Sequence, residues 1–369
     1  MIKKLNLQNF KSFGNLDLSD LSRITLVGGR NNIGKTSLLE SIFFFYDLGD
    51  PSFLIRLQAW RGLDAFSVDA DTLAAPIFRD FDKGRQIKIE LQEDIYHGEM
   101  NVAFVSSLAQ KSIDVTLTEG NTLAQQLSPE QSMLISYALD IQYKIDGQKD
   151  LQTRLTVKQS PTNLNIQFEP GLTSGFPEGM ARGAAFFGLR TKSDPGEDAV
   201  RFGQLDIIPG KVNQIVDLLK ILEPSLLSLS SVAVHPQKSI IHADIGMGRK
   251  IPVAYMGDGM SRLLSILLAI AAIKRGIILI DEIDAGIHYS VLPKIWEGIC
   301  RAAREFQCQI IATTHSYECL RAAYEGASLA NASSEFRYIR FDQKDKEIVA
   351  KPYTHKVLGA ALEEGWEVR

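Results

Sequence analysis

The chain has 369 residues, of which 45% are hydrophobic and 23% are charged, with a formal net charge of −4 at pH 7. These values are typical of a soluble globular protein with two to three domains, or with one large domain carrying insertions, and they exclude a disordered or collagen-like chain. The negative net charge gives no global electrostatic attraction for nucleic acid, so nucleic-acid binding would require a local basic patch.

The first predicted element is a hairpin around Phe10-Lys11-Ser12-Phe13, with strands at residues 2–9 and 15–18. Its opening, MIKKLNLQNF, alternates polar and apolar residues like a strand and unlike a signal sequence. The three cysteines fit no zinc spacing. We therefore expect a cytoplasmic protein with reduced thiols.

A glycine-rich segment, GGRNNIGKTSLLE at residues 28–40, follows the apolar strand predicted at Ile24–Val27. Its Gly-x-x-x-x-Gly-Lys-Thr pattern is typical of a phosphate-binding loop that leads into a helix, here expected at Lys35–Tyr46. Lys35 would reach the β- and γ-phosphates of ATP, and the hydroxyl of Thr36 would bind Mg²⁺. The expected nucleotide-binding residues are Gly29, Asn31, Asn32, Ile33, Gly34, Lys35, Thr36 and Ser37.

The middle of the chain changes character at about residue 86, after an irregular stretch from 47 to 85. Strand-like segments lie at Gln86–Gln92, Asn101–Val105, Ile113–Thr118, Ile141–Ile145 and Leu151–Val157. They predict an antiparallel β insertion, interrupted by a helix near 128–139. Residues 175–200 are rich in Gly, Pro and charge, and predict loops.

A helix is predicted at Lys211–Leu222, followed by strands near residues 230 and 240. Residues 251–320 then alternate between strand-like and helix-like segments, as in a parallel α/β sheet. The longest apolar run, at 263–273, is too short to cross a bilayer and predicts a buried helix. No membrane partner is expected.

Two carboxylates end the apolar strand predicted at 276–280, in the sequence GIILIDE. The carboxyl end of a buried parallel strand is where α/β proteins bind ligands. Asp281 would hold Mg²⁺, and Glu282 would orient and deprotonate the attacking water. A second buried strand, at 309–314, ends in His315, which would bond a γ-phosphate.

The segment Met256-Gly-Asp-Gly-Met-Ser261 precedes the predicted buried helix and offers another helix N-terminus to an anion. We expect backbone N–H groups of Gly257, Asp258, Gly259 and Ser261 to contact the phosphates, and the side chain of Asp258 to turn away and cap the helix that starts at Met260.

These elements, in this order, resemble the ABC-type ATPase heads of the RecF and SMC group. On that resemblance residues 29–36 are the Walker A motif, Asp281-Glu282 Walker B, Asp284-Ala285-Gly286 the D-loop, and His315 the switch histidine. The stretches GRNNIGKTSLLE, GDGMSRLL and LIDEIDAGIHYSVL resemble most closely the ATPases of OLD (overcoming lysogenization defect) proteins and their relatives in anti-phage systems. Asp284 would then lie near the nucleotide.

The resemblance implies a mixed or parallel P-loop core sheet with an inserted antiparallel β subdomain. Residues 1–369 would form one ATPase head. Its parts would be an N-terminal lobe with Walker A (1–85), an inserted β-rich and helical region (86–210), a lobe with the remaining motifs (211–335), and a C-terminal hairpin and helix (336–369). Two heads would assemble head to tail, as a homodimer or a higher even-numbered oligomer.

The sequence departs from the group in three ways. Gly257 stands where the signature motif has a serine, which predicts slow hydrolysis. Only 54 residues follow His315, too few for the Toprim nuclease domain of OLD nucleases. No sustained heptads separate Thr36 from Gly257, which excludes a long coiled coil. The residue of the glutamine loop stays open between Gln92 and Gln159.

The leading interpretation is an ATP-driven switch that controls a separate effector, a nuclease, in bacterial anti-phage defence. The alternative is a RecF-like DNA repair or recombination ATPase that binds DNA through Lys11, Arg182, Arg190, Lys192 and Arg201. A transporter's ATP-binding subunit and a nucleotide-gated scaffold with little turnover are weaker alternatives. The first conflicts with the long spacing between Walker A and Gly257, and the second with Glu282.

Overall fold

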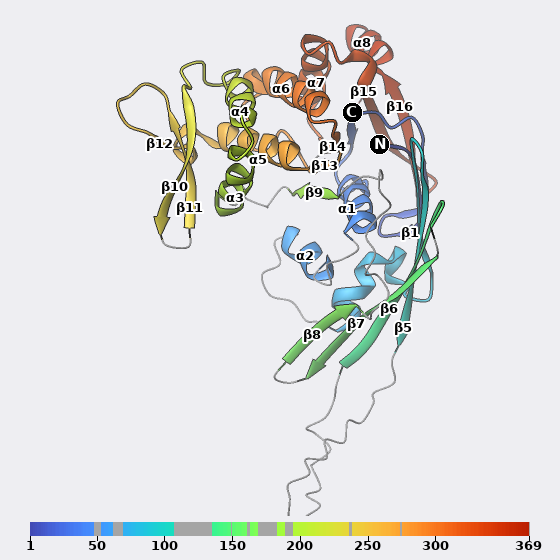
Figure 1. Ribbon diagram of the computed structural model, residues 1–369. Helices are drawn as coiled ribbons and strands as arrows, with labels where there is room; N and C mark the ends of the chain where they lie inside the picture. Colours follow the sequence, from blue (N-terminus) through green and yellow to red (C-terminus); the bar gives the residue numbers. More distant parts are fainter. Residues whose placement is uncertain are drawn as a thin grey trace, which may run out of the picture.

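The computed structural model describes residues 1–47, 53–61, 69–106, 135–148, 150–160, 163–168, 183–188, 195–235, 238–273 and 275–368. Within these residues the strands form three β-sheets, and helices cover or join them (Figure 1). No helix in the described ranges is long and apolar enough to cross a membrane.

The core sheet has six strands, all parallel except one edge strand. In spatial order they are β16 (Glu347–Thr354), β15 (Phe336–Lys344), β3 (Ile24–Gly29), β14 (Gln309–Thr313), β13 (Ile277–Ile280) and β9 (Ala184–Phe187). Every residue of β3, β13 and β14 is buried, as their uninterrupted apolar runs predict. Since these three strands are parallel neighbours, their carboxyl ends meet at one edge of the sheet.

Alternate residues of the core strands face two different hydrophobic cores. Ile278 and Ile310 belong to one core, together with helices α5 (Asp258–Ala272), α6 (Leu292–Glu305) and α7 (Tyr317–Leu329). Leu279 and Ile311 belong to the other, with helix α1 (Lys35–Tyr46) and the second sheet. Helix α1, which begins and ends where the sequence predicts, therefore lies between two sheets (Figure 1).

The second sheet has seven antiparallel strands and joins the N-terminal hairpin to the predicted β insertion. In spatial order they are β2 (Phe13–Leu18), β1 (Ile2–Phe10), β4 (Ile87–Glu93), β5 (His97–Ser106), β6 (Ile135–Ile145), β7 (Leu151–Ser160) and β8 (Asn163–Phe168). The helix predicted near 128–139 is wrong over 135–139, because this segment pairs with β5 and β7 as part of β6. The ranges 113–118 and 128–134 lie outside the described residues.

The third sheet is small and stands at the left in Figure 1. It contains β10 (Ser228–His235), β11 (Lys238–Asp244) and β12 (Ile251–Pro252), and packs on helices α3 (Pro195–Asp206) and α4 (Lys211–Leu219). The loops predicted over 175–200 are wrong at β9 and at the start of α3. Since β9 pairs with β13 and α3 contacts α5, these segments belong to the core layers.

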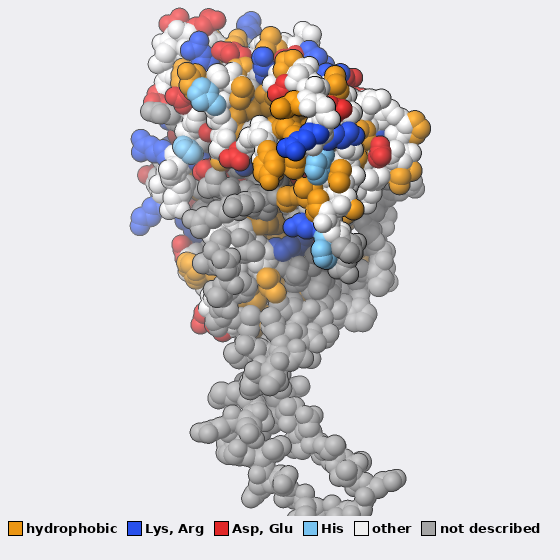
Figure 2. All heavy atoms as spheres, turned by 90° about the vertical axis from the view of Figure 1, so that its left-hand side faces the viewer, with side chains coloured by type: hydrophobic (Ala, Val, Ile, Leu, Met, Phe, Trp, Pro, Cys, Tyr) orange, Lys and Arg blue, Asp and Glu red, His pale blue; other side chains and the backbone are white. Residues whose placement is uncertain are grey.

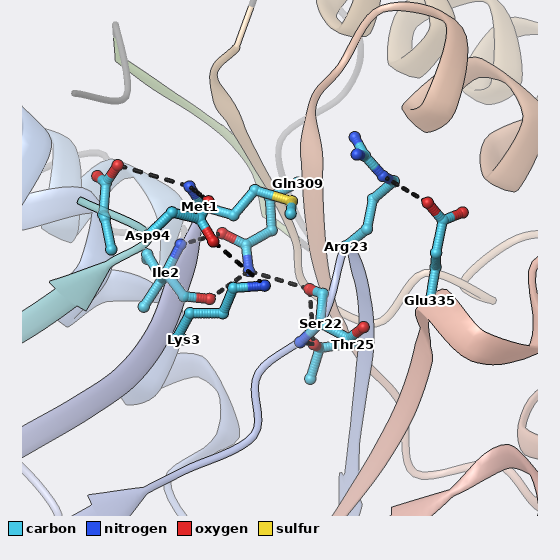
Figure 3. A network of polar contacts seen from close by, with 10 residues as sticks. Met1, Ile2, Lys3, Ser22, Arg23, Thr25, Asp94, Gln309 and Glu335 are labelled. Atoms are coloured by element: carbon cyan, nitrogen blue, oxygen red, sulfur yellow. Dashed lines mark hydrogen bonds and ion pairs between the residues drawn. The ribbon is translucent and has the colours of Figure 1, made fainter. Parts of the chain in front are cut away.

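A buried glutamine links the core sheet to the second sheet (Figure 3). The side-chain oxygen of Gln309, on β14, accepts a hydrogen bond from the Ile2 N–H at 2.8 Å. Its amide nitrogen donates to the carbonyls of Ile2 at 2.8 Å and of Ser22 at 2.9 Å. This buried polar group is therefore satisfied by backbone on both sides of the sheet junction.

Candidate nucleotide-binding site

The loop between β3 and α1 has the backbone that its glycines predict. Asn32 and Gly34 have φ angles of 61° and 87°, in the left-handed region. Gly29, with φ of 139°, lies so close to the neighbouring strand that a Cβ atom there would be 2.7 Å from the carbonyl oxygen of Phe341. A side chain at Gly29 is excluded both by conformation and by space. The loop thus presents N–H groups at the N-terminus of α1, where anions bind.

Lys35 is buried at the first position of α1, with 7% of its surface exposed, and does not face solvent as its place in a polar loop suggests. Its ammonium donates to the carbonyl oxygens of Gly29 at 2.8 Å and Arg30 at 2.9 Å. Burial lowers the pKa of Lys35, and the carboxylates of Glu282 and Asp281 oppose this shift. An ammonium has three donors, so these bonds leave one for a phosphate oxygen.

One hydroxyl connects the carboxylate of Asp281 to the backbone of Glu282 at the end of β13. Thr313, at the end of β14, donates to Asp281 Oδ1 at 2.7 Å and accepts the Glu282 N–H at 2.9 Å. The other carboxylate oxygen of Asp281 accepts from the Thr36 hydroxyl at 2.9 Å. Three parallel elements thereby converge, as predicted from the strand ends.

Thr36 and Asp281 fit a magnesium site. Both offer oxygen ligands, the type that Mg²⁺ prefers, and the two atoms lie within one coordination shell of each other. Burial raises the pKa of Asp281, because its charge is desolvated. A divalent cation would offset that cost, taking its remaining ligands from phosphate and water. The described residues contain no group of three or more His, Cys, Asp or Glu side chains that could hold a metal ion.

Glu282 has an unusual backbone and a partner in the predicted switch histidine. Its φ angle is 44°, which is uncommon for a residue with a side chain. Its carboxylate lies 3.3 Å from His315 Nδ1, and both side chains are partly exposed. The Arg262 guanidinium, reaching over from α5, donates to the carbonyl oxygens of Asp281 at 3.1 Å and Glu282 at 3.0 Å.

The predicted signature segment lies at the start of α5 and is open to solvent. Gly257 is exposed, and Cβ atoms placed on Gly257 or Gly259 would meet nothing within 4 Å. The expected cap by Asp258 is wrong: α5 begins at Asp258 itself, with Gly257 as N-cap and no side-chain capping bond. Asp258 instead occupies the first helical turn, where a carboxylate favours the helix dipole.

A cleft of about 490 Å³ gathers part of the predicted site. Asn31, Asn32, Ile33, Gly34, Lys35, Thr36, Ser37, Asp281 and Glu282 line it. The cleft lining does not include Gly29, Asp284, His315 or the signature residues Gly257, Asp258, Gly259 and Ser261. The carboxylate of Asp284 instead accepts a hydrogen bond from the Thr314 hydroxyl at 2.7 Å. Of the two glutamine-loop candidates, Gln92 is exposed on β4 away from the cleft, and the side chain of Gln159 is not described.

The cleft also has walls that sequence reasoning missed. Residues 76–78, 80 and 81 form one wall, and Leu57, Gln58 and Arg61 another. Beside them Lys11 and Arg61 both pair with the fully buried Glu40, at 2.7 Å and 3.0 Å. The one sequence signal for this cluster was the position of Glu40, which lies one turn into the predicted helix.

The described part of the structure does not support the basic surface that was suggested for DNA binding. Lys11 is buried against Glu40, and Arg201 pairs with Glu197 and Asp198 within α3. Arg182, Arg190 and Lys192 lie outside the described residues.

A family model and two relatives match this chain over different shares of its length. A family model described as "AAA domain, putative AbiEii toxin, Type IV TA system" matches residues 24–321. An "ATP/GTP phosphatase" of Helicobacter pylori is 20% identical over 96% of this chain and 95% of its own length. An uncharacterized protein of Methanocaldococcus jannaschii, MJECL11, is 31% identical over 24% of this chain and 76% of its own length.

Two solved structures of SMC head domains also align with the chain. One, an SMC head bound to the C-terminal winged-helix domain of ScpA, has a TM-score of 0.49 and 16% identity, with 98% of this chain and 99% of that chain covered. The other, an SMC head with an extended coiled coil bound to the C-terminal domain of ScpA from Pyrococcus furiosus, has a TM-score of 0.46 and 13% identity, with 98% of each chain covered.

The strand pairing confirms the predicted α/β fold with a parallel core sheet and an antiparallel subdomain, and the family model supports the P-loop. The match to the family model covers the loop after β3, the acidic end of β13 and the end of β14. The chain belongs to the family of AAA domains described as putative AbiEii toxins of type IV toxin–antitoxin systems, and it is a P-loop ATPase.

Proposed function

We propose that the chain is a slow, ATP-operated switch that controls a separate effector, a nuclease, in bacterial anti-phage defence. ATP and Mg²⁺ bind in the cleft beside α1. Lys35 contacts the β- and γ-phosphates, Thr36 and Asp281 hold the metal ion, and Glu282 activates water. His315 orients the carboxylate of Glu282 and senses the γ-phosphate.

The observation that carries this proposal is the convergence of the loop, both carboxylates and the histidine at one sheet edge. Thr36 and Asp281 are 245 residues apart in sequence, yet their side chains share a hydrogen bond. The Thr313 hydroxyl then links Asp281 to the backbone of Glu282. Motifs that converge in space support a site more strongly than motifs in sequence alone.

A second copy of the chain completes the site. The signature residues lie outside the cleft of their own chain, and the open space over Gly257 and Gly259 supports their packing on the nucleotide of a partner copy. Tyr255 and Met247, on the same lobe, are 81% and 68% exposed. Figure 2 shows this side of the molecule, with hydrophobic side chains between charged ones. Exposed apolar groups of this kind support a contact with another protein.

The role in defence rests on the resemblance to OLD-type ATPases and on the family's description as putative toxins of type IV toxin–antitoxin systems. The H. pylori relative, named for hydrolysis of ATP and GTP, supports nucleotide turnover. The family description and the H. pylori relative are sequence similarities only, so the effector has to be identified by experiment.

Hydrolysis is tested by Lys35→Ala. We expect ATP turnover to vanish and nucleotide binding to weaken strongly, since the ammonium at the loop is lost. The change releases the carbonyl oxygens of Gly29 and Arg30, so circular dichroism of the apo variant checks that the fold is kept. Wild-type turnover by Lys35→Ala would contradict the site.

The effector is tested in a bacterial host that carries this gene with its two flanking genes. We expect protection from phage that is lost in Lys35→Ala and in a deletion of one flanking gene, and no nuclease activity from the purified chain alone. Cleavage of DNA or RNA by the pure chain, unaffected by Lys35→Ala, would contradict a separate effector.

A further inference from the structure

The rim of the cleft carries two consecutive residues with left-handed backbone. Asp80 and Phe81 have φ angles of 55° and 59°, and both line the cleft. Phe81 is 66% exposed, although a phenylalanine side chain is usually buried. Left-handed non-glycine residues cost free energy and gather at functional sites. This pair has no role in phosphate binding or hydrolysis.

The rim is held firmly against the N-terminal hairpin. Arg79 donates to the Ser12 carbonyl oxygen, and the Lys11 N–H donates to the Ile77 carbonyl oxygen at 3.0 Å. Phe78 forms a β-bridge with Phe10. The N–H of Phe81 bonds the Phe78 carbonyl at 3.2 Å, which closes the turn. The exposed ring of Phe81 is therefore presented from a fixed backbone.

A chain of contacts runs from the metal end of the cleft to this rim. Thr36 bonds Asp281, where the metal ion and the terminal phosphate would lie. The next residue, Ser37, has its hydroxyl 3.5 Å from that of Ser12. Ser12 in turn is held by Arg79, directly before Asp80. These contacts connect the rim to the start of α1, and the rim lines the same cleft as Lys35 and the two carboxylates.

We propose that Phe81 and Asp80 form a nucleobase subsite that takes the purine ring of a nucleoside triphosphate. Phe81 stacks on the ring, and the Asp80 carboxylate accepts a hydrogen bond from an exocyclic amino group. This subsite rests on the proposed function, since it requires the phosphates to occupy the loop at Lys35. The cleft volume of about 490 Å³ is in the range of small-ligand sites.

The chemistry predicts which nucleotides bind. Stacking on an aromatic side chain accepts any purine, and a carboxylate accepts hydrogen bonds only from donors. Adenine offers its 6-amino group and guanine its 2-amino group, so ATP and GTP both fit. Inorganic tripolyphosphate has no base, and purine riboside triphosphate has the ring without an amino group.

The test measures dissociation constants by calorimetry in the Glu282→Gln background, so that the nucleotides stay intact. We expect ATP to bind about tenfold or more tightly than tripolyphosphate, the scale of one stacked base. Phe81→Asn should remove this ratio and leave tripolyphosphate binding unchanged. Asparagine tolerates the left-handed backbone, so the loop is preserved. Ile95→Asn, at an apolar residue that is 72% exposed and outside the cleft lining, is the control and should keep the ratio.

Asp80→Asn tests the amino-group contact separately. In the parent background ATP should bind several-fold more tightly than purine riboside triphosphate, and Asp80→Asn should abolish that difference. Equal affinity for ATP and tripolyphosphate in the parent, or an unchanged ratio in Phe81→Asn, would overturn the subsite while leaving the phosphate site intact. Failure of both ligands to bind the parent would overturn the proposed function, and the subsite with it.

Discussion

At the scale of single residues, the hydroxyl of Thr313 holds the carboxylate of Asp281 and the backbone of Glu282. It donates to Asp281 and accepts from the backbone of Glu282, so its donor and acceptor capacities are both used. Thr313 is fully buried. A buried group that fixes a metal ligand and the backbone of a general base should influence catalysis without touching the nucleotide.

Thr313→Val is the isosteric test. We expect the free energy of unfolding to fall by about 1–3 kcal/mol, because the Glu282 N–H and one oxygen of Asp281 lose their partner. We also expect kcat for ATP to fall about tenfold, with KM changed less. Steady-state kinetics and urea unfolding measure the two effects.

The control is Thr25→Val. Thr25 is also fully buried in a core strand, and its hydroxyl bonds only the backbone of Ser22 in the described structure. It should lower stability by a similar amount and leave kcat unchanged. Equal kinetic effects of the two variants would show that Thr313 acts through stability alone.

The ion-pair cluster in the cleft wall predicts a pH dependence. Burial lowers the pKa of Lys11 from 10.5 to about 8, although Glu40 opposes the shift. Between these two values the unfolded chain binds more protons at this site than the folded chain. The contribution of Lys11 to the free energy of unfolding therefore rises with pH from about 8 to 10.5.

This dependence is measured as the stability difference between the wild type and Lys11→Met at pH 7, 8.5 and 9.5. The wild type should gain on the variant above pH 8, by on the order of 1 kcal/mol per pH unit. A difference that stays constant, or that shrinks with rising pH, would show that Lys11 is not charged and desolvated in the folded protein.

At the scale of elements, α5 joins the signature segment to the end of β13. Arg262, one turn into this helix, donates to the carbonyl oxygens of Asp281 and Glu282. Its Nε is buried without a hydrogen-bond partner among the described residues. A movement of the helix would therefore displace the backbone of the general base directly.

Arg262→Lys should lower kcat about tenfold and change KM less than threefold, because both bonds come from the terminal Nη2 and the shorter lysine would not place a donor there. Arg304→Lys is the matched control. Arg304 also bridges two backbone carbonyl oxygens, of Ala330 at 3.2 Å and Asn331 at 2.9 Å, but on the far side of α6. Equal kcat in Arg262→Lys and the wild type would mean that the contact does not position Glu282.

Elements with a strong local pattern were predictable from sequence, and those made by long-range pairing were not. Helix α1 and strands β3, β13 and β14 have local signals, namely glycine turns and uninterrupted apolar runs. Strand β9 has four residues in a segment rich in glycine and charge, and exists through its pairing with β13. Segment 135–139 mixes strand formers such as Ile135 and Tyr137 with helix formers, and its pairing with two neighbouring strands decides the extended form.

The same distinction applies to the site. Lys35, Thr36, Asp281 and Glu282 stand in motifs whose spacing carries their chemistry, so the sequence predicted them. Phe81 comes from a stretch without periodicity, and only the contacts of residues 77–79 with the N-terminal hairpin bring it to the cleft.

At the scale of the whole molecule, the signature segment does not line the cleft of its own chain. The cleft lies between α1 and the rim, whereas Cβ atoms placed on Gly257 and Gly259, at the start of α5, would meet nothing of the described chain within 4 Å. If a second copy supplies its glycines to this cleft, bound ATP joins the two copies, because its γ-phosphate adds contacts that ADP lacks.

Glu282→Gln is expected to trap this assembly. It keeps the shape of the site and removes the general base, so ATP persists and dimers or higher even-numbered oligomers accumulate with Mg²⁺.

Gly259→Val in the same background should remain monomeric, because the added side chain projects into space needed by the partner's phosphates. Gly203→Val, at another helical glycine whose Cβ would meet nothing within 4 Å, is the control and should still assemble. Light scattering at micromolar protein distinguishes these outcomes. A strictly monomeric Glu282→Gln with bound ATP, or equal assembly of Gly259→Val and Gly203→Val, would exclude the composite site even if Lys35 still binds nucleotide.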